Sequence, residues 1–110
     1  MEKRSIKQEE VDLIQHLLSL KKLNPFDFFI NSEVSDYEGA VMRSIGLGNL
    51  NAMYAGDIIQ VKYVDSDQIP VLITLTKDIE GKLLDLDFWK EDFSALITYP
   101  KPGYLELILI

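Results

Sequence analysis

The sequence predicts an α+β fold, in which an N-terminal helix packs on a mainly antiparallel sheet of about five to six strands. Two observations support this prediction. Apolar residues recur at helical spacing near the start of the chain, and many later apolar residues alternate with polar ones, as in strands with one buried face. With 110 residues the chain is long enough for one domain, which we place at residues 1–110.

The helix is predicted at residues 6–22. Ser5 and Gln8 have the spacing of a capping box at its start. Asn24 ends it, because a residue that precedes proline is disfavoured in the helical region. The wide apolar stripe of this helix needs a sheet or a second helix to cover it. The stripe consists of Val11, Leu13, Ile14, Leu17, Leu18 and Leu20.

The strands are predicted from alternating patterns separated by turn residues. The expected hairpins are residues 34–38 with 41–47, joined at Glu38-Gly39-Ala40, and residues 57–64 with 69–76. A turn at residues 78–81 then leads to a strand around residues 84–89. The register that best matches the apolar faces pairs Ile73 with Leu86, and it directs Leu84, Leu86 and Phe88 toward the core.

Two apolar segments lie outside these strands. Residues 25–30 contain Phe26, Phe28 and Phe29, which we interpret as a hydrophobic plug over the end of the core, because large aromatic side chains are usually buried. An aromatic binding patch is the alternative. Residues 104–110 end in Leu-Glu-Leu-Ile-Leu-Ile and are predicted to form a strand, paired either into the sheet or in a dimer interface. A short helix in this tail is the alternative.

The chain is acidic, with a formal net charge of −7. Residues 57–92 hold nine acidic and four basic side chains, so this region alone has a net charge of −5. Such a surface repels the phosphates of nucleic acids and attracts a basic protein partner. The alternative is that the acidity only keeps the protein soluble.

Composition excludes several classes of site. The chain has no cysteine and one histidine, His16, so it forms no disulfide, no thiolate-bound metal site and no site with several histidines. No Gly-x-Ser-x-Gly elbow accompanies its serines. We therefore predict no catalytic residues, no metal and no cofactor. The polar start of the chain and the absence of a long apolar run predict a cytoplasmic protein without a membrane segment.

The strand around residues 84–89 provides the candidate binding surface. Asp85, Asp87 and Trp89 alternate with apolar residues and therefore share the outer face of this strand. Tryptophan is enriched among the residues that dominate binding energy in interfaces, so Trp89 is the expected anchor. The alternative is that the N-terminal helix or the C-terminal tail covers Trp89 within the chain. Neighbouring charged residues are expected to steer a partner toward it. The complete candidate set is Lys62, Asp65, Asp67, Asp85, Asp87 and Trp89.

The same region resembles a known family. The segment Leu-Asp-Phe-Trp-Lys-Glu-Asp-Phe at residues 86–93 is similar to the Leu-Asp-x-Trp-Lys-x-Asp-Phe signature of a family of small bacterial domains of unknown function. Arg43-Ser44-Ile45, Ile69-Pro70-Val71 and Tyr99-Pro100 extend the resemblance. The chain departs from the family pattern at residues 41–44, where a glycine-rich step is expected, and at residues 67–68. The resemblance implies a compact α+β module and carries no established activity.

We therefore expect a non-enzymatic protein-interaction module, of an immunity type or with another regulatory role, that binds a basic protein. The alternative is a domain that binds a small molecule or a divalent cation through Asp85, Asp87 and Lys62, since paired carboxylates suit hard cations. A homodimer formed through the C-terminal strand is a third expectation.

Overall fold

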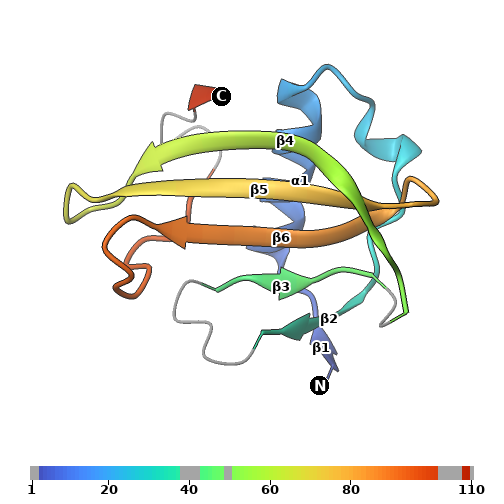
Figure 1. Cartoon of the computed structure of the whole chain (residues 1–110), viewed down its shortest axis with the longest axis horizontal. Coiled ribbons are helices and arrows are strands. Elements are labelled where there is room, and N and C mark those ends of the chain that lie inside the picture. Colours follow the sequence, from blue (N-terminus) through green and yellow to red (C-terminus); the bar gives the residue numbers. More distant parts are fainter. Residues whose placement is uncertain (1–2, 38–42, 49–50, 102–107, 110) are drawn as a thin grey trace.

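In the computed structural model, which describes residues 3–37, 43–48, 51–101 and 108–109, one α-helix lies against one face of a seven-stranded sheet (Figure 1). Every strand pair is antiparallel, in the order β1-β2-β3-β6-β5-β4-β7. The helix is α1 (Gln8–Leu20), and a 3₁₀ turn, η1 (Pro25–Asp27), follows it. The strands are β1 (Lys3–Ser5), β2 (Glu33–Asp36), β3 (Ile45–Gly46), β4 (Tyr54–Val64), β5 (Pro70–Asp78), β6 (Leu83–Lys90) and β7 (Ile108–Leu109).

This architecture confirms the predicted α+β class and the mainly antiparallel sheet. The sheet has more strands than the predicted five to six, because short strands form at its edges. One of them, β1, precedes the helix and pairs with β2, so the helix is the second element of the chain. No helix in the described part of the chain is long and apolar enough to cross a membrane.

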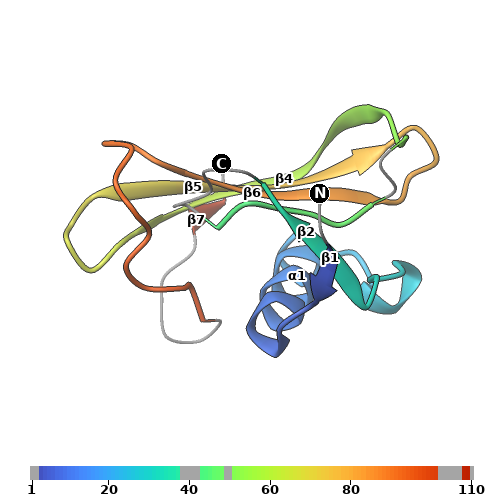
Figure 2. The ribbon, with the colours of Figure 1, turned by 90° about the horizontal axis from the view of Figure 1, so that it is seen from below.

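The helix α1 begins two residues later than predicted, and a different residue pair caps it. Ser5 belongs to β1, and the backbone N–H of Lys7 donates to Glu10 Oε1 at 2.8 Å. An acidic side chain at this position satisfies a backbone donor and suits the positive end of the helix dipole. The apolar stripe of α1 packs on the sheet as predicted, with Leu13, Ile14, Leu17 and Leu18 fully buried. Figure 2 shows α1 on one side of the sheet only.

The central strands β4, β5 and β6 form the hairpins that their patterns predicted, with a shifted register. Ile73 pairs with Phe88, and Leu75 pairs with Leu86, two residues away from the predicted alignment. An even shift leaves every side chain on the same face, so the apolar residues still meet. The register then slips between Leu75 and Lys77, and as a result Leu83 is buried at the start of β6 in place of the predicted Leu84.

The remaining strand predictions agree where the structure describes them. Ser35 pairs with Gly46, which confirms the predicted pairing of β2 and β3, while the turn at Glu38-Gly39-Ala40 lies outside the described residues. In the C-terminal tail, Leu109 of β7 pairs with Val61 of β4. This pairing confirms a strand within the sheet for residues 108–109, and residues 104–107 and 110 lie outside the described part.

The predicted aromatic plug is wrong for two of its three members. Phe26 is 88% exposed and Phe29 is 77% exposed, and only Phe28 packs against the core. Phe26 lies in the 3₁₀ turn, which contains no buried residue and which Asn24 caps by accepting from Phe26 N–H at 3.0 Å. Phe28 follows in extended backbone, where neighbouring side chains point to opposite sides, so Phe28 faces the core and Phe29 faces away from it.

Candidate functional site

The face of the sheet that α1 leaves uncovered carries most of the predicted site residues. In register across three strands, Lys62 of β4 lies opposite Leu72 of β5, which lies opposite Trp89 of β6. The adjacent row consists of Gln60, Thr74 and Asp87. We call this surface the open face, made of Gln60, Lys62, Leu72, Thr74, Asp85, Asp87 and Trp89. The structure thus brings Lys62, Asp85, Asp87 and Trp89 together as predicted.

Three carboxylates interact on this side of the sheet. Asp85 accepts a hydrogen bond from the hydroxyl of Tyr37, and Asp57 accepts one from the hydroxyl of Tyr54 at 2.6 Å. The half-buried Asp87 lies two residues from Asp85 on β6. Burial, and then repulsion from Asp85 and Asp57, raises the pKa of Asp87 to about 6. The charged form of Asp87 is therefore less stable than that of a free carboxylate, and a cation placed beside it would offset the repulsion from Asp85 and Asp57.

The burial and charge repulsion of Asp87 predict that the variant Asp87→Asn is more stable than the native protein, by an amount that depends on pH. The pKa of Asp87 is higher in the folded chain than in the unfolded chain, so protonation stabilises the fold at low pH and this contribution is lost as the pH rises through about 6. The variant should exceed the native protein in free energy of unfolding by about 1–2 kcal/mol at pH 7.5, after allowance for solvent screening, and match it near pH 4. Urea denaturation followed by circular dichroism measures this difference.

Glu91→Gln is the matched control, because it neutralises an exposed carboxylate just beyond the same strand. It should change the free energy of unfolding by less than about 0.5 kcal/mol at either pH. Equal stability of Asp87→Asn and the native protein at pH 7.5 would contradict the repulsion among Asp57, Asp85 and Asp87.

Two exposed aromatic side chains stand at the end of β6. Trp89 is 44% exposed and Phe93 is 67% exposed, and their rings meet edge to face with centroids 5.6 Å apart. We call them the aromatic pair. Phe93 has a φ of 61°, in the left-handed region that non-glycine residues seldom adopt. Such strain persists only when the surrounding structure holds it, and it concentrates at functional positions.

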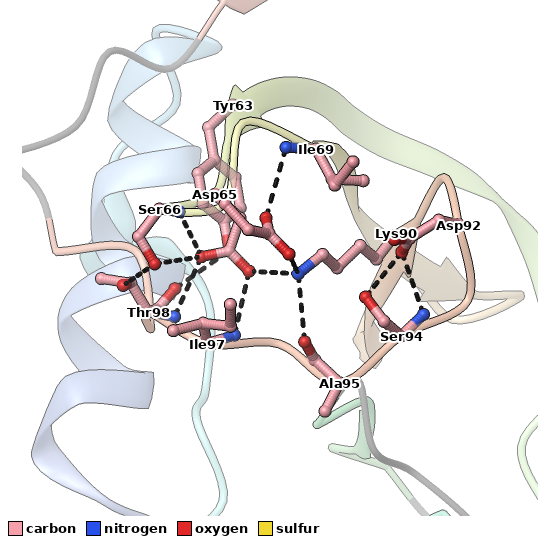
Figure 3. A network of polar contacts seen from close by, with 11 residues as sticks. Tyr63, Asp65, Ser66, Ile69, Lys90, Asp92, Ser94, Ala95, Ile97 and Thr98 are labelled. Carbon is pink, nitrogen blue, oxygen red and sulfur yellow. Dashed lines mark hydrogen bonds and ion pairs between the residues drawn. The ribbon is translucent and has the colours of Figure 1, made fainter.

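The structure that holds this loop is a buried ionic network around Lys90 (Figure 3). The ammonium of Lys90 donates to Asp65 Oδ2 at 2.9 Å, to Asp67 Oδ2 at 2.6 Å and to the carbonyl of Ala95 at 3.1 Å. The side chains of Lys90 and Asp65 are fully buried. We call Asp65, Asp67 and Lys90 the Lys90 network. It ties the turn between β4 and β5 to the segment that follows β6.

Asp65 extends the network to the backbone of that segment. Its carboxylate accepts from the N–H groups of Ile97 at 2.9 Å and Thr98 at 3.0 Å, as well as from Ser66 N–H at 2.7 Å. Burial alone would raise the pKa of Asp65, but the hydrogen bonds from Ile97 and from Lys90 outweigh it and lower the pKa to about 2. The carboxylate therefore stays charged and fixes residues 95–98 to the turn.

These contacts correct part of the predicted site. Asp65 and Asp67 are structural partners of Lys90, and Asp65 has no exposed side chain to steer a partner. The physical reason is the alternation of β4, which places Asp65 on the same face as the buried Val61 and Tyr63.

Three further residues interact with members of the open face but were not predicted as site residues. They are Phe93, which contacts Trp89, Tyr37, which donates to Asp85, and Asp57, which raises the pKa of Asp87. Phe93 was visible in the signature segment, yet its exposure depends on the loop geometry. Among the described residues, no group of three or more histidine, cysteine, aspartate or glutamate side chains is placed to hold a metal ion.

Comparison with known proteins confirms that the chain contains a domain of unknown function. A family model described as "Domain of unknown function (DUF6984)" matches residues 3–100. No curated protein and no solved structure matches the chain. The family description names no activity, so the function has to be inferred from the geometry of the open face and the loop that follows β6.

Proposed function

We propose that this chain, which belongs to the DUF6984 family of domains of unknown function, is a non-enzymatic protein-interaction module. Its partner is a basic protein, which it binds through the aromatic pair and the adjoining acidic part of the open face. A small acidic module that covers a basic surface of another protein suits a regulatory role of the immunity type.

The observation that carries the proposal is the exposure of the aromatic pair at fixed positions, with Trp89 near the end of β6 and Phe93 in the loop that follows it. Aromatic anchors contribute most to binding when they are held in place beforehand, because little conformational entropy is then lost in the complex. Here the Lys90 network fixes the loop through the carbonyl of Ala95, and the edge-to-face contact with Trp89 positions the ring of Phe93. The N–H of Phe93 also donates to the carbonyl of Lys90 at 2.9 Å, and this turn keeps Phe93 in its left-handed conformation.

Charge supports a basic partner. Asp85 and Asp87 precede Trp89 on β6, and Glu91 and Asp92 precede Phe93 in the loop. Lysine or arginine side chains of a partner would relieve the repulsion that Asp87 experiences in the free protein. Such complementarity accelerates association and gives specificity. The expected partner therefore has an apolar pocket for an aromatic side chain, surrounded by positive charge.

The test compares the native chain with the double variant Trp89→Ala, Phe93→Ala. Both are used as bait in a lysate of the source cells, and each captured protein is purified for calorimetric titration. Loss of two anchor residues should weaken binding at least 100-fold, because residues of this type contribute about 2 kcal/mol or more each. Circular dichroism establishes that the variant is folded.

The matched control is Phe26→Ala, Phe29→Ala, which removes two aromatic side chains at least as exposed on another part of the surface. This variant should bind with native affinity. A captured protein that binds all three baits equally, or one with an acidic binding surface, would contradict the proposal. Empty captures together with a thermal shift on addition of divalent cations or metabolites would support the alternative of a small-ligand domain.

A further inference from the structure

A polar pocket of about 380 Å³ lies at the N-terminus of α1, with walls that come from β1, α1, β2 and the segment that ends in Tyr99. Among its lining residues are Lys7, Glu9, Arg43 and Tyr99. We call it the Tyr99 pocket. It shares no residue with the aromatic pair or the Lys90 network, and it meets the open face only through Tyr37, a lining residue whose hydroxyl donates to Asp85.

Two of the acidic groups in this pocket share one guanidinium. Arg4 donates to Glu10 Oε1 at 3.0 Å and Oε2 at 2.7 Å, and to Asp36 Oδ1 at 2.9 Å and Oδ2 at 2.8 Å. The guanidinium thus binds both carboxylates in bidentate geometry, the strongest form of such contacts. Arg4, Glu10 and Asp36 consequently form one wall of the pocket, in which the charged groups bind one another.

A second pair of charges is held loosely. Arg43 and Glu9 approach only to 3.8 Å, and their side chains are 46% and 31% exposed. The guanidinium of Arg43 also lies 5.8 Å from the centre of the Tyr99 ring, over its face. Arg43 adopts a φ of 62°, a further left-handed non-glycine residue. One positive and one negative group thus lie side by side in the pocket, each with an incomplete set of close contacts among the described residues.

The hydroxyl of Tyr99 provides independent evidence for a ligand in this pocket. Tyr99 is only 7% exposed, and its hydroxyl is the one buried side-chain polar atom in the described part of the chain that has no hydrogen-bond partner. Buried polar groups are almost always paired, because an unpaired one costs about 1–3 kcal/mol. Burial, followed by the charges of Glu10 and Glu9, raises the pKa of Tyr99, so the hydroxyl keeps its proton and acts as a donor.

From this arrangement we infer that the Tyr99 pocket binds a small zwitterion, a molecule with an ammonium and a carboxylate on the same carbon, as in a free α-amino acid. The carboxylate replaces the loose contact at Arg43 with a bidentate pair and accepts from the Tyr99 hydroxyl, while the ammonium pairs with Glu9. Because Arg43 covers the ring of Tyr99, its half-exposed side chain moves as the ligand enters. The volume is within the usual range for a small-molecule site, about 300–1,000 Å³.

The test is an NMR titration of the full chain with each of the twenty standard L-amino acids in turn. At least one should shift the backbone amide signals of Lys7, Glu9, Arg43 and Tyr99. Acetate and methylammonium are titrated at the same ionic strength and should leave these signals in place, because each supplies only one of the two charges.

Two variants assign the binding to the pocket. Tyr99→Phe removes only the unpaired hydroxyl, so the free protein should be at least as stable as the native one, while the dissociation constant rises about tenfold. Arg43→Asn removes the charge while keeping a residue that tolerates left-handed φ, and it should weaken binding at least as much. The control Tyr54→Phe removes a hydroxyl that donates to Asp57 outside the pocket. This variant should bind the amino acid with native affinity.

Three results would overturn the inference. They are the absence of a shift with any amino acid, shifts of equal size with acetate alone, and an unchanged dissociation constant in Tyr99→Phe. None of these results bears on capture of a basic partner by the aromatic pair, so the two proposals fail separately.

Discussion

Replacing Lys90 with methionine is expected to lower the free energy of unfolding by about 3–5 kcal/mol, an unusually large effect for a single substitution. Methionine fills a similar volume, so the loss comes from the charge. Asp65 would remain fully buried without a cation, and the carbonyl of Ala95 would lose its donor. A buried charge left unpaired costs far more than the ion pair itself contributes. Guanidinium denaturation followed by tryptophan fluorescence and circular dichroism measures the loss.

Two variants serve as controls for this prediction. Lys62→Met makes the same chemical change on the open face, where the side chain is exposed, and should cost less than about 0.5 kcal/mol. Asp67→Asn removes the second partner of Lys90, whose side chain is 32% exposed, and should cost less than Lys90→Met. If Lys90→Met were as stable as Lys62→Met, the Lys90 network would not hold the loop, and the fixed presentation of the aromatic pair would have no structural basis.

Replacing Glu10 with alanine is expected to cost about 2–4 kcal/mol, whereas the same change at Asp36 should cost less than about 1 kcal/mol. Both carboxylates bind Arg4, but the Glu10 side chain is 4% exposed and the Asp36 side chain is 56% exposed. Glu10 also accepts from Lys7 N–H and so caps α1, a contribution of about 1 kcal/mol by itself. Thermal and urea denaturation of the two variants under identical conditions give the comparison.

The contrast between Glu10 and Asp36 tests the assignment of stability to burial and capping. Equal losses in the two variants would show that the ion pair with Arg4 dominates irrespective of solvent exposure. Glu10→Gln refines the measurement, because an amide oxygen can still accept from Lys7 N–H while the charge is lost. Glu10→Gln should be more stable than Glu10→Ala by about 1 kcal/mol, the contribution of the cap to the free energy of unfolding.

The fold class followed from local periodicity. In β4, β5 and β6, the alternating part of each strand indicates which side chains face the core, and the structure agrees for Val61, Ile73 and Leu86. The exact register did not follow, because an even shift leaves all faces unchanged and hydrophobicity cannot distinguish the two alignments. The slip near Leu75 that buries Leu83 likewise depends on how three strands fit together.

The candidate site divides in the same way. Alternation along one strand placed Asp85, Asp87 and Trp89 on a shared face, a property that requires no knowledge of the neighbouring strands. The same alternation puts Asp65 beside Tyr63 and Lys90 beside Phe88 on the core face. Burial of a charged residue at a core position cannot be predicted until its partner is known, because an unpaired buried charge is strongly destabilising.

That partner was decided by tertiary structure. Asp65 and Lys90 are 25 residues apart, and only the packing of β4, β5 and β6 into one sheet brings their charges to 2.9 Å. The ion pair in turn fixes the loop that exposes Phe93, and packing at the start of α1 similarly creates the pocket around Tyr99. Local pattern thus determined the faces of the strands, because it depends on neighbours in the chain. Long-range contacts decided which charges are structural and which aromatic residues are exposed, because burial is a property of the assembled fold.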